Sequence, residues 1–263
     1  MNNIKEVYPF NTPPIFYDIG CRGGIEKQWK KHIIDNKVIA YGFDPDVEHC
    51  KNLSKADNQT KFISKALSNY QGTSKFYKTK NLGCCSCKEP NLDFLKRYPH
   101  TFGSFRIMKE STIEVTTLNN LIDDKIILPP NYIKIDVQGL EYEVLEGCDK
   151  HLKNVYGIKL ETHFQPIYKK EKTFFEVYDL LVNKHGFMLR QLNNISYYDG
   201  DQLEYDAFFT RGPLTPNDTY LKDMFFSKIY NLDPPRIACM SRAHRNNSNI
   251  PEKKFYEKYG FYQ

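Results

Sequence analysis

Apolar residues recur along the chain at two spacings, one typical of strands and one typical of helices. Ile15, Phe16, Tyr17 and Ile19 form a short apolar run, and glycines follow at once. Ile25, Trp29 and Ile33 then recur at helical spacing, and residues 38–43 form a second apolar run. This pattern predicts a strand, a tight turn, a helix that packs back on the sheet, and a second strand.

The same alternation continues to residue 211. The clearest helical pattern spans residues 171–185, with Gly186 as its stop. Because strands alternate with helices, the chain is predicted to be an α/β protein with a mostly parallel sheet and helices on both faces. The last two strands predict a hairpin that adds one antiparallel strand. The further predicted strands span residues 61–67, 73–78, 113–118, 132–137, 155–162, 187–192 and 205–211.

The character of the sequence changes after residue 212, where prolines break the pattern. We therefore divide the chain into a domain over residues 1–212 and an extension over 213–263. A helix is expected from about 217 to 232, and residues 236–263 are polar and basic. The extension is expected to be a docked helix with a loose tail, with a partner or acceptor surface as the alternative.

Composition narrows the class of protein. The 263 residues are 40% hydrophobic, enough for a sizeable core without cross-links. The net charge of +5 does not by itself favour nucleic acid, and none is expected as a partner. Seven irregularly spaced cysteines, without a leader sequence, predict reduced thiols and a cytoplasmic protein. No apolar stretch is long enough to span a bilayer.

The glycine turn after the first predicted strand indicates a nucleotide site. Gly20 and Gly24 allow a ligand to approach the backbone, and Asp44 ends the second strand, where it would accept hydrogen bonds from ribose hydroxyls. The dinucleotide pattern G-x-G-x-x-G is broken, because Arg22 replaces its second glycine. Asp18 would repel a pyrophosphate but suits a cationic amino group. S-adenosylmethionine (SAM) is therefore favoured over NAD.

Six segments together make the chain resemble the FkbM family of SAM-dependent methyltransferases, from about Tyr17 to Arg211. They occur in order and at family-like spacing. They are DIGCRGG at 18–24, YGFDPD at 41–46, KALSNYQG at 65–72, GCCSCKEPN at 83–91, IKIDVQGLEYEVLEG at 133–147 and LETHFQPIY at 160–168.

The resemblance implies a class I methyltransferase (Rossmann-like) fold and methyl transfer to oxygen, in many members on a sugar or secondary-metabolite hydroxyl. The chain departs from the family pattern at Gln138, where many relatives have Glu, and at Cys85 and Cys87. It places Asp136 at the end of the fourth strand of the fold. By the same resemblance SAM would contact Asp18, Gly20, Gly24 and Asp44, with Ala66, Leu67 and Ser68 beside the adenine.

Methyl transfer to a hydroxyl needs a base, or a metal that lowers the pKa of the hydroxyl. Asp136, Glu161 and His163 follow two neighbouring predicted strands and are the candidates for either role, with Mg²⁺ or Mn²⁺ as the ion. The alternatives are structural. Asp136 would cap a helix, Glu161 would pair with Lys134 or Lys159, and His163 would be a packing residue.

Cys84, Cys85 and Cys87 form a cluster without the second pair that a zinc site needs. We expect this loop to close over the cleft instead. Assigning these thiols as metal ligands would require stoichiometric zinc in the protein.

The leading hypothesis is a SAM-dependent O-methyltransferase acting on a glycan or on a sugar-bearing small molecule. Three alternatives remain open from the residues. They are an RNA or protein methyltransferase on the same fold, an NAD-linked sugar oxidoreductase, and an inactive sugar- or nucleotide-binding module.

Overall fold

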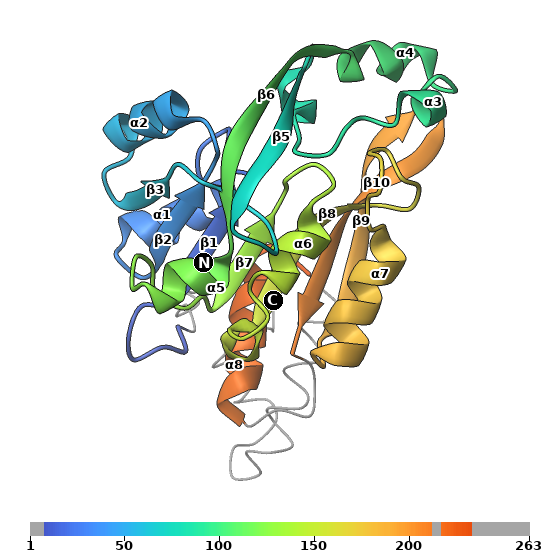
Figure 1. Cartoon of the computed structure of the whole chain (residues 1–263). Helices are drawn as coiled ribbons and strands as arrows, with labels where there is room; N and C mark the ends of the chain where they lie inside the picture. The colour runs from blue at the N-terminus through green and yellow to red at the C-terminus, as the bar shows by residue number, and fades with distance from the viewer. Residues whose placement is uncertain (1–7, 212–216, 233–263) are drawn as a thin grey trace.

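The computed structural model describes residues 8–211 and 217–232, and its centre is a seven-stranded mixed sheet. The first five strands of the sheet order run parallel, and β10 runs antiparallel to both β8 and β9 (Figure 1). The predicted parallel sheet with a terminal antiparallel strand is therefore confirmed. The order across the sheet is β3 (Thr60–Ile63), β2 (Ile39–Phe43), β1 (Ile15–Ile19), β7 (Tyr132–Ile135), β8 (Gly157–His163), β10 (Asp201–Thr210) and β9 (Met188–Tyr198).

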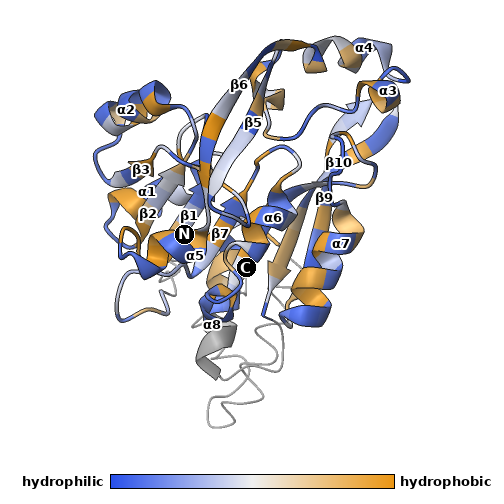
Figure 2. Ribbon diagram, in the orientation of Figure 1, coloured by the Kyte–Doolittle hydropathy of each residue, from blue (hydrophilic) through white to orange (hydrophobic). Residues whose placement is uncertain are grey.

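Helices cover both faces of this sheet, as the alternation predicts. On one face, α1 (Lys27–Ile34) and α8 (Asn217–Ile229) enclose a core in which Trp29 stacks on Phe16 with ring centroids 4.0 Å apart. On the other face lie α5 (Leu118–Asp123), α6 (Glu141–Glu146) and α7 (Phe174–Tyr178), which continues as a π-helical segment to Lys184. Figure 2 shows apolar strands between helices whose outer surfaces are polar.

A three-stranded arm projects beyond the main sheet (Figure 1). It consists of β4 (Ala66–Leu67), β6 (Ile107–Thr116) and β5 (Gly72–Thr79), in that order. Short helical turns at Leu82–Cys84 and Gly103–Phe105, with α3 (Leu92–Leu95) and α4 (Pro99–Phe102), connect β5 to β6. Phe105 of this arm packs with Tyr168 and Tyr198 of the main domain in a third apolar cluster. The arm is thereby attached to the β9–β10 hairpin.

Three sequence-based boundaries were wrong. The predicted strand over 61–67 is two strands, because the chain turns at Lys65 and enters the second sheet. The strand predicted near 113–118 is the end of the longer β6. The helix expected from 171 begins at Phe174, since Thr173 and Glu176 form a capping box there.

The C-terminal helix α8 follows β10 and turns back onto the sheet. Phe225 and Phe226 are buried against Tyr132, and an added Cβ at Gly157 would meet the Phe226 ring at 2.5 Å. The expectations for residues 233–263, including the basic tail, lie outside the described residues. Among the described residues, no helix has both the length and the apolar character to cross a membrane. Helix α2 (Val47–Ala56) and the short turn Leu152–Asn154 complete the described helices.

Candidate functional site

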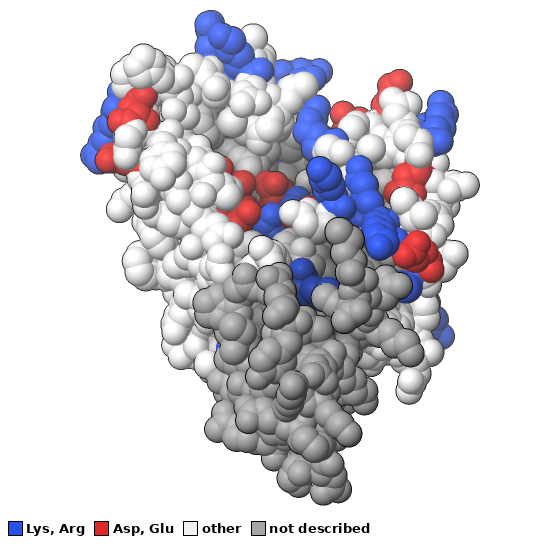
Figure 3. All heavy atoms as spheres, turned by 180° about the vertical axis from the view of Figure 1, so that it is seen from behind, with Lys and Arg blue, Asp and Glu red and all other residues white. Residues whose placement is uncertain are grey.

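A cavity of about 770 Å³ lies at the carboxyl ends of β1, β2 and β7, beneath the arm. This is where an open α/β sheet binds its ligand. Figure 3 shows acidic side chains gathered in a hollow on this side of the molecule. Seven carboxylates and four cationic side chains line the cavity: Asp18, Glu26, Asp44, Asp46, Asp136, Glu161 and Glu204, with Arg22, Lys65, Lys78 and Lys134.

The glycine turn between β1 and α1 forms one wall, as predicted from the sequence. Gly20 has a φ of 83°, and a Cβ added to it would lie 1.7 Å from the carbonyl oxygen of Asp136. Gly24 has a φ of 84°. Both residues line the cavity. Only glycine fits at position 20, because both the positive φ and the neighbouring backbone exclude a side chain.

Asp18 also lines the cavity, but it has protein partners of its own. Its side chain accepts a hydrogen bond from the backbone N–H of Glu26 at 2.7 Å and lies 3.2 Å from the ammonium of Lys134. The parallel register of β1 and β7 places Asp18 beside Lys134. Burial raises the pKa of Asp18, and Lys134 opposes that shift. Lys134, which the sequence suggested as a partner of Glu161, pairs with Asp18 and Asp136 instead.

Asp44 lies at the carboxyl end of β2, where the sequence places it. Its Oδ1 accepts a hydrogen bond from the backbone N–H of Asp46 at 2.8 Å, which holds the carboxylate at the cavity wall. Burial raises the pKa of Asp44. Ala66 and Leu67 of β4 line the same cavity, whereas Ser68 is buried behind them and is not among the lining residues.

Gln138 connects two of the three candidate catalytic residues. Its side-chain amide donates hydrogen bonds to Asp136 at 3.0 Å and to Glu161 at 2.6 Å. The side-chain carbonyl of Gln138 accepts a hydrogen bond from the Tyr168 hydroxyl at 2.8 Å. Gln138 has a φ of 58°, an uncommon conformation for a residue other than glycine. The loop after β7 is thus shaped so that one amide holds both carboxylates together.

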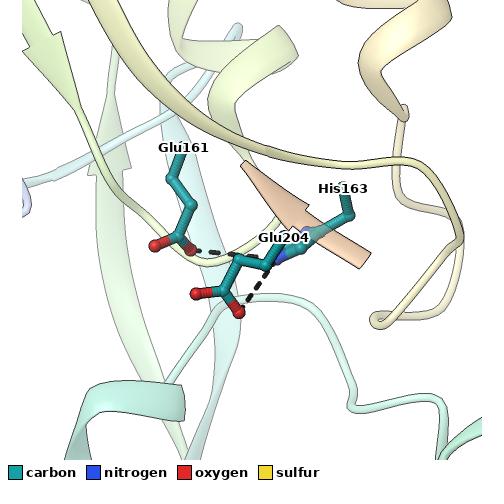
Figure 4. Close-up of side chains that lie close together, drawn as sticks. All are labelled: Glu161, His163 and Glu204. Carbon is teal, nitrogen blue, oxygen red and sulfur yellow. Dashed lines mark ion pairs between the residues drawn. The ribbon is translucent and has the colours of Figure 1, made fainter. Parts of the chain in front are cut away.

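His163 lies behind this pair and does not line the cavity. Glu161 lies within β8, as it does within the strand predicted over 155–162, and β8 extends one residue further to include His163. The two residues share a face because they are two residues apart. Glu204 stands directly opposite His163 on β10. Figure 4 shows the three side chains converging, with His163 Nε2 3.8 Å from an oxygen of each glutamate.

Two further buried glutamates surround this group. Glu171 bonds to Nδ1 of His163 and accepts a hydrogen bond from the backbone of Tyr168 at 3.0 Å. Glu141 accepts hydrogen bonds from the backbone N–H groups of Val137 and Gly139. The sequence analysis missed Glu141, Glu171 and Glu204, because their proximity depends on strand register and on where α7 begins.

The pKa values of these groups reflect burial among like charges. Burial and the neighbouring Asp136 and Glu204 raise the pKa of Glu161 well above its usual value. Burial, with Glu171 adding to it, raises the pKa of Glu141 to about 7. Burial disfavours a charged His163, but Glu171, Glu204 and Glu161 outweigh that effect and raise its pKa. Burial among like charges thus favours the protonated forms of these groups.

The cysteine-containing loop forms the roof of the cavity. Cys84, Cys85 and Cys87 all line it as free thiols. Between them, the hydroxyl of Ser86 donates a hydrogen bond to the backbone carbonyl of Gln138 at 2.6 Å. The loop thus contacts the segment that carries the acidic pair.

Residues 23–189 match the family described as the methyltransferase FkbM domain, which is well over half of the chain. No curated protein matched the sequence.

Three solved structures illustrate the more distant similarities. A precorrin-6y C5,15-methyltransferase from Geobacter metallireducens is 11% identical with a TM-score of 0.37, over 77% of this chain and 82% of that one. A TehB-like SAM-dependent methyltransferase from Corynebacterium glutamicum is 10% identical, with a TM-score of 0.35 over 77% and 83%. A Burkholderia thailandensis 1,6-didemethyltoxoflavin-N1-methyltransferase, solved with S-adenosylhomocysteine (SAH), is 8% identical, with a TM-score of 0.38 over 76% and 71%. Scores this low carry no inference about substrate.

Proposed function

The chain belongs to the FkbM methyltransferase family, and from this premise we propose that it transfers a methyl group from SAM to a hydroxyl of a sugar, glycan or glycosylated small molecule. The observation that carries the proposal is the pair Asp136 and Glu161. Both carboxylates line the same cavity as the glycine turn and Asp44. A proton acceptor and a nucleotide-binding wall thus share one enclosed space.

The charge of the cavity supports SAM as the methyl donor. Its carboxylates outnumber its cationic groups, and Lys134 is already paired with Asp18 and Asp136. Such a lining favours a sulfonium and disfavours a pyrophosphate. In this assignment Asp44 binds the ribose hydroxyls, Gly20 and Gly24 allow close approach of the methionine part, and Ala66 and Leu67 contact the adenine. The Asp18 carboxylate pairs with Lys134 and thereby offsets the positive charge of that side chain on this wall.

Asp136 is the residue we assign as the base. Its side chain is 36% exposed, so an acceptor can reach it, whereas the side chain of Glu161 is 9% exposed. Gln138 and Lys134 fix the position of the Asp136 carboxylate. As the acceptor oxygen bonds to the methyl carbon, the bond from carbon to sulfur breaks and SAH leaves as a neutral thioether. The hydroxyl proton passes to Asp136.

A hydroxyl acceptor suits the remaining lining of the cavity. Phe76, Phe105 and Tyr198 offer ring surfaces on which a sugar can pack. Carboxylates nearby accept hydrogen bonds from its other hydroxyls. The arm supplies Phe76 and Phe105, so acceptor specificity is assigned to the arm and donor binding to the main sheet.

The test is methyl transfer from labelled SAM to a panel of sugars, nucleotide-sugars and glycans, with the product located by NMR. Asp136→Asn is expected to lower the rate about 10²–10⁴-fold while SAH still binds. Asp123→Asn serves as the control, because Asp123 pairs with exposed Lys150 and does not line the cavity. A native rate in Asp136→Asn, or a methyl group found on nitrogen or carbon, would refute the assignment.

A further inference from the structure

The acidic group around His163 carries more negative charge than the protein itself balances. Glu161, Glu171 and Glu204 all pair with this one imidazole. Across residues 8–211 and 217–232, no lysine or arginine forms an ion pair with any of the three. The side chains of His163 and Glu171 are each 1% exposed, so water screens them little. With all three carboxylates ionised, even a protonated imidazole leaves an excess of negative charge in a buried place, which is costly.

The Nε2 atom of His163 is directed between two carboxylates that it does not reach. It lies 3.8 Å from Oε1 of Glu161 and 3.8 Å from Oε2 of Glu204. Both distances exceed the roughly 3.2 Å reach of an N–H···O hydrogen bond. Two ligand atoms on one ion, each bonded at about 2.1 Å, lie at most about 4.2 Å apart. The spacing therefore suits an ion between the side chains better than it suits a direct hydrogen bond.

The contacts outside this trio are those of a metal site. Nδ1 of His163 is bonded to Glu171, which fixes the ring and leaves Nε2 to face the two glutamates. Gln138 orients Glu161, and the Tyr198 hydroxyl donates to Glu204 at 2.8 Å. A carboxylate on the far nitrogen of a histidine ligand is the usual outer support of a bound metal.

We propose that Glu161, His163 and Glu204 bind one divalent transition-metal ion, for which Mn²⁺ is the probe. The three ligand atoms lie within 4.8 Å of one another, so the carboxylates must move inward to bring all three within about 4.2 Å when an ion binds. Glu204 replaces Asp136 in the ligand set that was predicted from the sequence. One nitrogen with two carboxylate oxygens favours Mn²⁺ over Mg²⁺, since Mg²⁺ prefers an all-oxygen set.

The role of the ion rests on the proposed methyl transfer, although its binding does not. Glu161 and Glu204 both line the cavity, so the open coordination positions face the acceptor side. A hydroxyl bound there would have a lowered pKa and would lose its proton more readily to Asp136. His163 and Glu171 act as ligand and positioning residue behind the cavity wall.

The test is Mn²⁺ binding to the full chain after removal of metals by a chelator, followed by calorimetry and by the electron paramagnetic resonance of Mn²⁺. Wild type is expected to bind one Mn²⁺, and Glu204→Gln to bind it at least about tenfold more weakly. Glu171→Gln is expected to weaken it about 10–100-fold, the usual cost of losing an outer support. The control is Glu143→Gln, because Glu143 is paired with Lys88 and does not line the cavity.

Absence of Mn²⁺ binding in wild type, or equal affinity in a folded Glu204→Gln, would overturn the proposal. If Glu204→Gln does not fold, Glu161→Gln takes its place with the same expectation. SAH titrated into the same samples separates the two proposals. SAH binding without Mn²⁺ binding would remove the metal site alone, and Mn²⁺ binding without SAH binding would remove the methyl-donor assignment alone.

Discussion

Gln138 is the residue whose replacement most sharply tests how the acidic pair is held. In Gln138→Met the volume and the positive φ are retained, but the bonds to Asp136, Glu161 and Tyr168 are lost. Water can replace the bond to Asp136, which is partly exposed. Glu161 is buried and is left with an unmatched polar group that costs about 1–3 kcal/mol, whereas the Tyr168 hydroxyl keeps the backbone carbonyl of Cys84 as an acceptor at 3.1 Å. We expect the free energy of unfolding to fall by about 1–3 kcal/mol in total.

Urea unfolding followed by tryptophan fluorescence measures this change, with the slope of the transition checked for constancy. Gln191→Met is the matched control, because Gln191 makes one bond, to Asn193 on the same strand, and is half-buried. Loss of this bond in Gln191→Met is expected to lower the free energy of unfolding by about 1 kcal/mol or less. A Gln138→Met protein as stable as wild type, or no less stable than the control, would refute the reasoning that this amide holds a buried carboxylate in place.

Two further predictions concern other parts of the chain. Phe226→Ala should lower the free energy of unfolding by about 3–5 kcal/mol, because the ring is buried against Tyr132. Phe175→Ala is the control, since Phe175 is 65% exposed and should tolerate the change. Equal stabilities of the two variants would argue against a docked α8. Hydrogen exchange in residues 83–91 should slow when SAH binds if the cysteine loop closes over the cavity, and exchange that is indifferent to the ligand would remove that role.

The local unit at the start of the chain could be predicted because its signals are local. An apolar run, three glycines and a helical repeat lie within 30 residues, and the structure places β1, α1 and β2 there. Asn36, just after α1, adopts the left-handed conformation that commonly ends a helix, with a φ of 54°. Asp18, Gly20, Gly24 and Asp44 reach the cavity because each lies at or near a strand end.

The acidic group was only half predictable, because it depends on distant pairing. Glu161 and His163 share a face by alternation, but Glu204 joins them through the register of β8 with β10. Its pairing with β9 is irregular on both sides, and such bulges cannot be read from one sequence. Glu171 was assigned to a helix, yet the capping box starts α7 later and leaves Glu171 free to bond His163.

The arm was the least predictable part. Its residues between Thr79 and Ile107 form short turns whose apolar side chains pack on Tyr168 and Tyr198 as well as on one another. Neither a helical nor a strand period marks such a segment. Its place over the cavity follows only from the completed fold.

Titration calorimetry of SAH and NAD⁺ into wild type and Asp44→Ala tests the central claim most directly. Wild type should bind SAH and not NAD⁺. Asp44→Ala should bind SAH about 1.5–3 kcal/mol more weakly, since it loses hydrogen bonds to a charged group, which corresponds to about 10–150-fold in affinity. Tight binding of NAD⁺ by wild type, or an unchanged SAH affinity in Asp44→Ala, would contradict a SAM site at this end of the sheet.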